Sequence, residues 1–165
     1  MFRRHIAACA MVCIAGAAEA ELTPDAGPEH VLASIRANGA RKVMLELWDN
    51  EVVFDALLSH VDRGDTKWFP VWLQLREPAD GGISESIDIA FARAIPRAPQ
   101  AVLRLVGHGL EIDRICTSPF IEPDPGVAED YERKALRALS RVKDPKLKSL
   151  ARSCATGVRL PKERR

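Results

Sequence analysis

The apolar residues of this chain recur at helical spacing almost from end to end. Residues three or four positions apart lie on one side of an α-helix, whereas a half-buried strand needs alternating apolar and polar residues. In the clearest segment, Ile83, Ile87, Phe91 and Ala94 share one face. Only residues 110–112 suggest a strand, and they are too few to anchor a sheet. The sequence therefore predicts an all-α fold.

Glycine and proline divide this pattern into short helices. Pro28 and Pro99 suit the first turn of a helix, where the missing N–H has no helical partner. Gly39 and Gly64 suit the position just after a helix. We expect seven or eight short helices that pair as hairpins, with apolar stripes at residues 31–35, 43–48, 53–61, 68–75, 83–94, 102–106, 127–142 and 147–154.

The middle of the chain repeats a plan of helix, corner and helix. Three such units, at residues 31–48, 53–75 and 83–106, follow one another at a spacing of roughly 25 to 30 residues, which is near the shorter solenoid periods. In this respect about half of the chain resembles a short array of HEAT-like helical hairpins. The alternative is an irregular helical bundle that uses the same corners. The resemblance concerns architecture and implies no site residues.

The first twenty residues have the layout of a targeting segment. A basic start with Arg3 and Arg4 precedes an apolar run at residues 6–18 and the small-x-small site Ala18-Glu19-Ala20. This order is typical of a secretory signal peptide, here cleaved after Ala20. The run is shorter than the roughly 20 residues of a membrane span, and no later stretch is long enough either. We expect a periplasmic or secreted bacterial protein with one helical domain at 21–157 and a basic, flexible tail at 158–165.

Two cysteines remain after that segment, Cys116 and Cys154. An exported chain with one pair of cysteines is expected to oxidise it. Cys154 continues the apolar stripe of the last helix, which favours a structural disulfide over a catalytic thiol. The sequence therefore predicts that a bridge between these two residues ties the C-terminal hairpin to the rest of the domain.

Charge and motifs exclude several classes of function. Of the 24 basic and 23 acidic residues, Arg3, Arg4 and Glu19 lie in the targeting segment, so the remainder is close to neutral. Such a balance lacks the electrostatic footprint of a nucleic-acid-binding protein. No Cys-x-x-Cys or His-x-x-x-His spacing predicts a metal site, and no phosphate loop or dinucleotide fingerprint predicts a cofactor.

Four residues are candidates for a binding surface. Trp68 and Trp72 stand one helical turn apart; tryptophans at this spacing usually fill a packed seam, but an exposed one would anchor a partner. His108 lies between two glycines and precedes acidic residues, so it is the place to look for ligand or proton chemistry. Phe120 lies in a proline-rich crossing between helices and is expected to tuck against the body of the domain.

The function that these features favour is an exported, non-catalytic helical module that binds another protein of the cell envelope. Its size, targeting segment and cysteine layout are similar in general form to small periplasmic immunity proteins that block cell-wall amidase effectors, which implies an inhibitor or immunity role. The alternatives are a small envelope enzyme with a site near His108 and an envelope structural protein. The sequence does not identify the partner, the binding face or the oligomeric state.

Overall fold

A computed structural model describes residues 21–160, and in this range the chain forms nine α-helices and no strand, with helices making up 64% of the structure. The all-α prediction is therefore confirmed. The helices are α1 (Pro28–Asn38), α2 (Ala40–Trp48), α3 (Glu51–Asp62), α4 (Phe69–Arg76), α5 (Gly81–Ala94), α6 (Pro99–Leu103), α7 (Ile112–Ile115), α8 (Val127–Ser140) and α9 (Lys148–Gly157), with a short 3-10 helix, η1 (Pro145–Leu147), before α9.

The local signals for helix ends act largely as the sequence predicts. Pro28 and Pro99 begin α1 and α6, and Gly39, with φ +84°, forms the one-residue corner between α1 and α2. The Asn50 side chain accepts a hydrogen bond from the Val53 N–H and so caps α3. The helix that contains the apolar stripe at residues 83–94 begins two residues before that stripe. The Asp80 side chain caps α5 through the Ile83 N–H, so Gly81 and Gly82 already belong to the helix.

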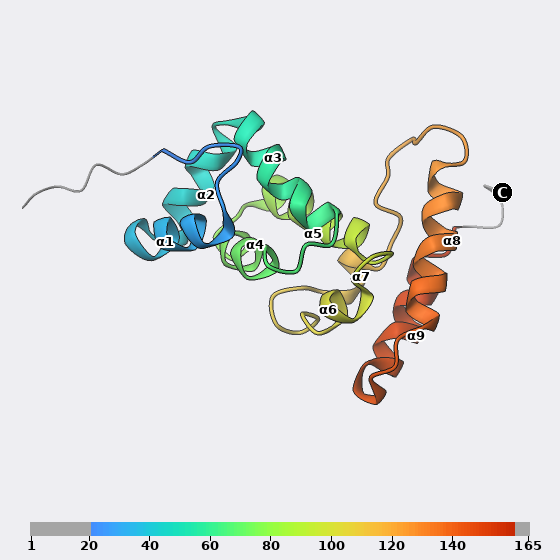
Figure 1. Ribbon diagram of the computed structural model, residues 1–165. Helices are drawn as coiled ribbons and strands as arrows, with labels where there is room; N and C mark the ends of the chain where they lie inside the picture. Colours follow the sequence, from blue (N-terminus) through green and yellow to red (C-terminus); the bar gives the residue numbers. More distant parts are fainter. Residues whose placement is uncertain (1–20, 161–165) are drawn as a thin grey trace, which may run out of the picture.

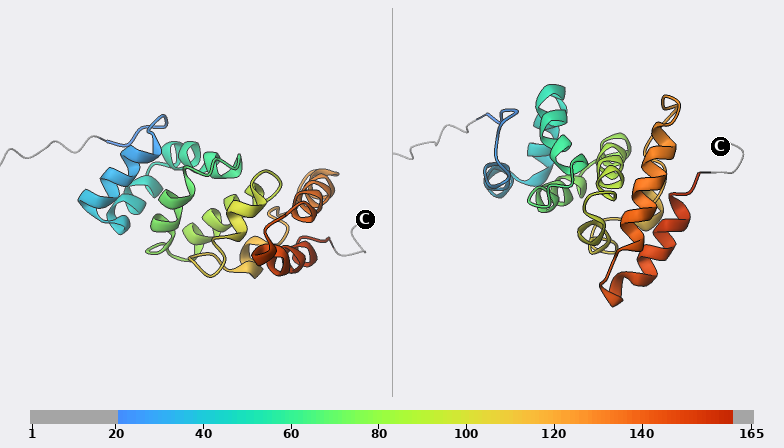
Figure 2. Two further views of the ribbon diagram at one scale, coloured as in Figure 1. Left: turned by 60° about the horizontal axis from the view of Figure 1, so that its bottom comes forward. Right: turned by 45° about the vertical axis from the view of Figure 1, so that its right-hand side comes forward.

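The helices stack in the order of the chain, so the sequence runs from one end of the elongated molecule to the other (Figure 1). Along this stack α3 packs against α5, α4 against α2 and α5, and α6 and α7 link α5 to the C-terminal hairpin of α8 and α9. The two turned views show the same progression (Figure 2). One continuous hydrophobic core joins the layers, and it extends from Ala26 to Val158.

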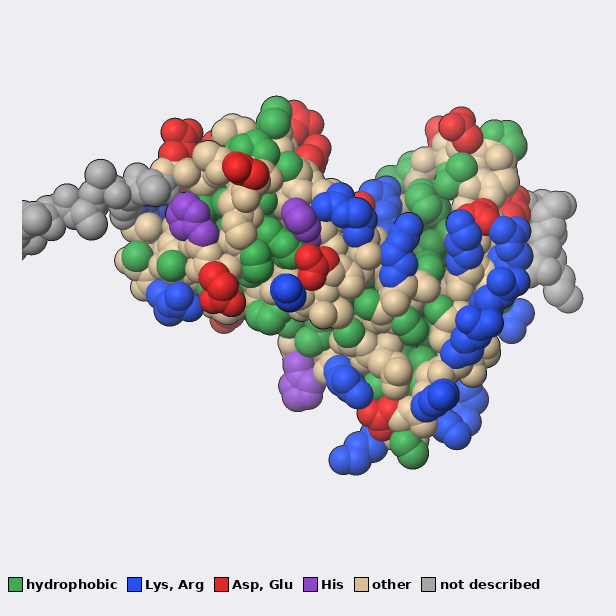
Figure 3. Space-filling view, in the orientation of Figure 1, with side chains coloured by type: hydrophobic (Ala, Val, Ile, Leu, Met, Phe, Trp, Pro, Cys, Tyr) green, Lys and Arg blue, Asp and Glu red, His purple; other side chains and the backbone are tan. Residues whose placement is uncertain are grey.

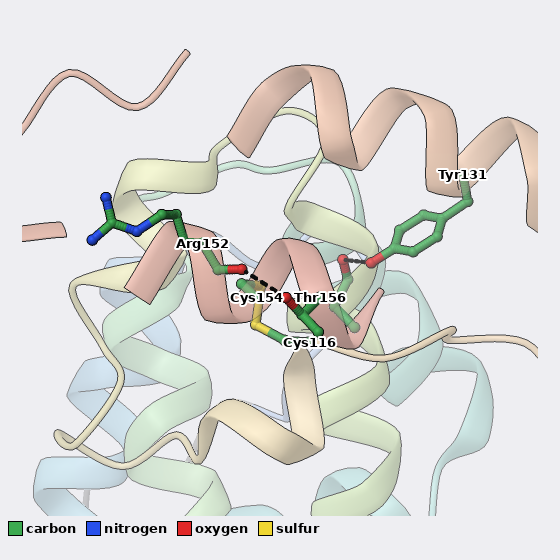
Figure 4. Close-up of a disulfide and its surroundings, with 6 residues drawn as sticks. Cys116, Tyr131, Arg152, Cys154 and Thr156 are labelled. Atoms are coloured by element: carbon green, nitrogen blue, oxygen red, sulfur yellow. Dashed lines mark hydrogen bonds between the residues drawn. A yellow bond between two sulfur atoms is a disulfide. The ribbon is translucent and has the colours of Figure 1, made fainter. Parts of the chain in front are cut away.

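The predicted disulfide is present and joins the end of α7 to α9 (Figure 4). The Cα atoms of Cys116 and Cys154 are 4.8 Å apart, and both side chains are buried. Gly157 lies against the same place, because a Cβ atom at this position would collide with the carbonyl oxygen of Cys116. The last helix is therefore held to the body by a covalent bond and by a close backbone contact.

A buried carboxylate on α5 links three helices. Asp88 is 3% exposed, and its two oxygens accept hydrogen bonds from Arg76 of α4 at 2.6 and 2.9 Å. Arg114 of α7 donates a third at 3.3 Å. The hydrogen bond to Asp88 raises the pKa of the Arg76 guanidinium. Both charges of this pair are thus withdrawn from water and depend on each other.

The ends of the chain bear on three sequence predictions. The proposed signal peptide lies outside the described residues, as do residues 161–165 of the predicted tail. Val158, the first residue of that tail, is 1% exposed and belongs to the core. Within residues 21–160, no helix is both long enough and apolar enough to cross a membrane.

Candidate binding groove

A groove opens where the C-terminal ends of α3 and α5 face the side of α8. Its volume is about 900 Å³, and Lys and Arg side chains flank the hollow on both sides (Figure 3). We call it the basic groove and define it by Arg63, Arg93 and Arg97 on one wall and Lys134, Arg137 and Arg141 on the other. It lies in the part of the molecule where the folded body meets the C-terminal hairpin.

Two aromatic side chains form the floor of the basic groove. Phe120 comes from the proline-rich crossing and contacts Tyr131 of α8 edge to face, with 5.6 Å between ring centroids. The Tyr131 hydroxyl donates a hydrogen bond of 2.9 Å to the backbone carbonyl of Ala92 in α5 (Figure 4). Burial raises the pKa of Tyr131, so the hydroxyl stays protonated and keeps this bond at all ordinary pH values. This hydrogen bond therefore also links α8 to α5.

The walls carry a large excess of positive charge. The six basic residues are accompanied by only two carboxylates, Asp62 and Asp130. Asp130 is engaged by Arg133 and by Lys134, the latter at 2.6 Å, and the hydrogen bond to Lys134 lowers its pKa. Arg137 follows Lys134 by three residues and Arg141 follows Arg137 by four, so Lys134, Arg137 and the C-cap residue Arg141 lie along one side of α8. Except for Arg93, all of the basic side chains are exposed, and of these Lys134 is already paired with Asp130.

A simpler explanation exists for single arginines in this set. Arg63 and Arg141 follow the last residues of α3 and α8, and Arg93 lies in the last turn of α5. A positive charge at a helix C-terminus is favourable by about 0.3–1 kcal/mol. That effect accounts for each arginine alone. It does not account for the meeting of three such helix ends around one hollow, which is a property of the tertiary fold.

Arg93 is held loosely at the edge of the basic groove. Its guanidinium donates to Asp62 at 3.5 Å and to the Pro119 carbonyl at 3.4 Å, and it lies 5.5 Å from the centroid of the Phe120 ring. The Nε atom of Arg93 and the Oδ1 atom of Asp62 are enclosed without a hydrogen-bond partner. Burial raises the pKa of Asp62, although Arg93 opposes the shift. The pair is thus incompletely satisfied in the free protein.

A second cavity continues from this pair between α3 and α5. It has a volume of about 840 Å³, and Asp62 and Arg93 line it as they line the basic groove. We call it the α3–α5 cleft. Its far end carries Glu51, Asp55 and Trp48. Trp48, at the end of the expected apolar stripe 43–48, is 45% exposed and contacts Phe54 edge to face.

The structure separates the four residues predicted for a binding surface. Trp68 and Trp72 are 2% and 0% exposed, so both belong to the core and neither can contact a partner. His108 is exposed and lines neither the basic groove nor the α3–α5 cleft. Among those residues, no three His, Cys, Asp or Glu side chains are grouped as a metal site would need. Only Phe120 lies in the groove.

Sequence reasoning missed the six basic residues of the groove. The spacing of Lys134, Arg137 and Arg141 on one helical face was a detectable signal. Arg63, Arg93 and Arg97 come from other elements and meet α8 only through the packing of the whole chain.

Comparisons with known proteins supply no further identification. No family model, curated protein or solved structure matched this chain. The groove and its charges are therefore the features that bear on function.

Proposed function

We propose that this protein is an exported, non-catalytic helical module of the bacterial cell envelope that binds another envelope or periplasmic protein through the basic groove. The narrower form of the proposal is an inhibitor or immunity-type protein. The observation that carries it is the collection of six basic side chains around one hollow with an aromatic floor. Stacked helical hairpins commonly present such a concave surface to a partner, and this step is an analogy between folds.

The distribution of charge favours a macromolecular partner over a small molecule. A small-molecule site encloses its ligand and places a few polar groups at converging positions. Here five exposed cations are spread along two walls, and the least exposed of the basic residues, Arg93, lies between them and the α3–α5 cleft. Exposed charges at the rim of an interface mainly steer association and select partners by complementarity. The expected partner surface is acidic.

Export is supported by two independent features. The order of residues at 1–20 is that of a signal peptide, and a disulfide joins the only two cysteines that follow it. Disulfides of this kind persist in oxidising compartments such as the bacterial periplasm. Sequencing the N-terminus of the protein from a periplasmic or secreted fraction should give a chain that begins at Glu21.

The test of the binding proposal compares two triple variants with equal loss of charge. The groove variant carries Arg97→Gln, Arg137→Gln and Arg141→Gln. The control carries Lys146→Gln, Lys148→Gln and Arg152→Gln, whose side chains are exposed and line none of the cavities described above. Each protein is immobilised and exposed to an envelope extract of the producing cells.

The wild type and the control should retain the same protein, and the groove variant should retain at least about tenfold less of it, equivalent to about 1.4 kcal/mol. Equal retention by both variants, or no specific retention by the wild type, would overturn the proposal.

A further inference from the structure

The basic groove and the α3–α5 cleft lie next to each other, and we refer to the two together as the depression. They meet at Asp62 and Arg93, which line both. Along this depression the walls change from α3 and α5 at the Trp48 end to α5 and α8 at the Arg141 end. A ligand that follows it must therefore be extended and must contact successive layers of the helical stack.

The two ends of this depression carry opposite charges. Glu51 and Asp55 lie in the α3–α5 cleft with exposed side chains, whereas Arg97, Arg137 and Arg141 lie in the basic groove. Opposite charges on a ligand would be favoured at each end, and like charges would be repelled. The depression thus selects a ligand whose charge changes sign along its length.

Trp48 adds a feature that suits one end of such a ligand. Its side chain is 45% exposed, at the same end as Glu51 and Asp55. A half-exposed tryptophan offers apolar area and a π-face that attracts Lys or Arg. The α3–α5 cleft is therefore suited to a basic side chain, which would meet an aromatic ring and two carboxylates.

A uniformly charged polymer does not fit this arrangement. A nucleic acid carries phosphates at every step, and those in the α3–α5 cleft would face Glu51, Asp55 and Asp62. A polypeptide can place basic residues in one half and acidic residues in the other. At the junction, the weakly held Arg93 with its 3.4 and 3.5 Å contacts can exchange them for a better acceptor on the ligand.

We infer that this depression binds an extended segment of a partner protein, with Lys or Arg at the Trp48 end and Asp or Glu beside α8. The inference rests on the proposed function and deepens it by naming the chemistry of the segment. Because the direction of the partner chain is open, the probes below include both orders of the charged blocks.

The probes are labelled synthetic peptides with a lysine block and a glutamate block, in either order, together with an all-glutamate peptide and single-stranded DNA of similar length. Binding is followed by fluorescence anisotropy. It is also followed by tryptophan emission, because Trp48 is exposed while Trp68 and Trp72 are buried. One block peptide should bind at least about tenfold more tightly than the all-glutamate peptide and the DNA, and it should change the Trp48 emission. Equal or tighter binding of the all-glutamate peptide or the DNA would overturn the inference.

Charge reversal provides the second arm of the experiment. Asp55→Lys should weaken binding of the favoured block peptide. It should improve binding of the all-glutamate peptide, because it removes repulsion between carboxylates in the α3–α5 cleft. Arg137→Glu should weaken binding of both peptides. Lys148→Glu, which lies outside the depression, should change the binding of neither peptide. Far-ultraviolet circular dichroism checks that each variant is folded. If the block peptides show no preference while capture of the native partner still depends on Arg97, Arg137 and Arg141, the proposed function stands and this inference fails.

Discussion

At Asp88 a buried carboxylate depends on two arginines from different helices. Replacing it with asparagine preserves the shape of the side chain but leaves Arg76, 17% exposed, without its charge partner. Breaking a buried ion pair from one side costs about 3 kcal/mol or more. We expect Asp88→Asn to lower the free energy of unfolding in urea by about 3 kcal/mol. Asp113→Asn, an exposed acid on α7, is the control and should change it little; equal effects of the two would contradict this account of Asp88.

At Asp62 the relevant quantity is the pH dependence of stability. Burial raises its pKa in the folded protein above the ordinary 3.8, so the folded state binds the proton more tightly than the unfolded state. Ionisation of Asp62 then lowers stability as the pH rises from 3.8 through the raised folded-state pKa. Asp62→Asn removes this cost. The variant should match the wild type below pH 3.8 and be more stable at neutral pH.

Urea denaturation across this pH range checks the prediction for Asp62. Asp55→Asn, which replaces an exposed carboxylate on the same helix, is the matched control. A neutral-pH stability of Asp62→Asn below that of the wild type would show that the ion pair with Arg93 outweighs the cost of burial. Retaining a destabilising carboxylate is consistent with a role for this pair in binding.

At the scale of single elements, α9 has an unusual requirement at its end. An alanine in a helix is normally more favourable than a glycine by up to about 1 kcal/mol. At Gly157 we expect alanine to be less stable than glycine, because the added Cβ atom collides with the Cys116 carbonyl. Overpacking of this kind costs about 1–3 kcal/mol. Gly157→Ala should therefore unfold at a lower urea concentration than the wild type. Ser153→Ala, on the exposed side of α9, should not.

The disulfide stabilises the fold mainly because it lowers the conformational entropy of the unfolded chain. The bridge joins residues 38 positions apart, and closing a loop of this length stabilises the folded state by roughly 4 kcal/mol in the chain-entropy model. The double variant Cys116→Ala, Cys154→Ala should lose about that amount of unfolding free energy.

The unreduced protein should also be two hydrogens lighter than the dithiol by mass spectrometry. A dithiol mass would contradict both the bridge and the oxidising compartment.

The elements were predictable from sequence where their signals are local. The stripe from Ile83 to Ala94 and the Pro28 start define helices without reference to the rest of the chain. The N-cap at Asp80 was missed because two glycines follow it and glycine usually indicates a loop. Asp88 looks like an ordinary polar residue within a helix, since its partners Arg76 and Arg114 come from other helices. Such pairs arise only when the elements pack.

At the scale of the whole molecule, the near-neutral total charge conceals a strong separation of charge. The α3–α5 cleft carries Glu51 and Asp55, and the C-terminal hairpin carries Lys134, Arg137 and Arg141. Lys and Arg side chains gather over this hairpin (Figure 3). Total composition could not reveal this separation, because it adds together the charges of the two ends of the chain. Phe120 was found from sequence because an aromatic residue in a proline-rich crossing must pack somewhere. The residues around Phe120 come from helices that are distant in the sequence, so sequence analysis did not identify them.

Photo-crosslinking in the cells that produce this protein tests whether another protein occupies the basic groove. A photoreactive residue replaces Ala138 inside the basic groove or, as a control, Ser149 on the exposed surface of α9. We expect a crosslinked product of defined mass from position 138 that is absent from position 149 and disappears when Arg97, Arg137 and Arg141 are changed to glutamine. The same products from both positions, or a product at 138 that survives loss of the three arginines, would contradict the claim.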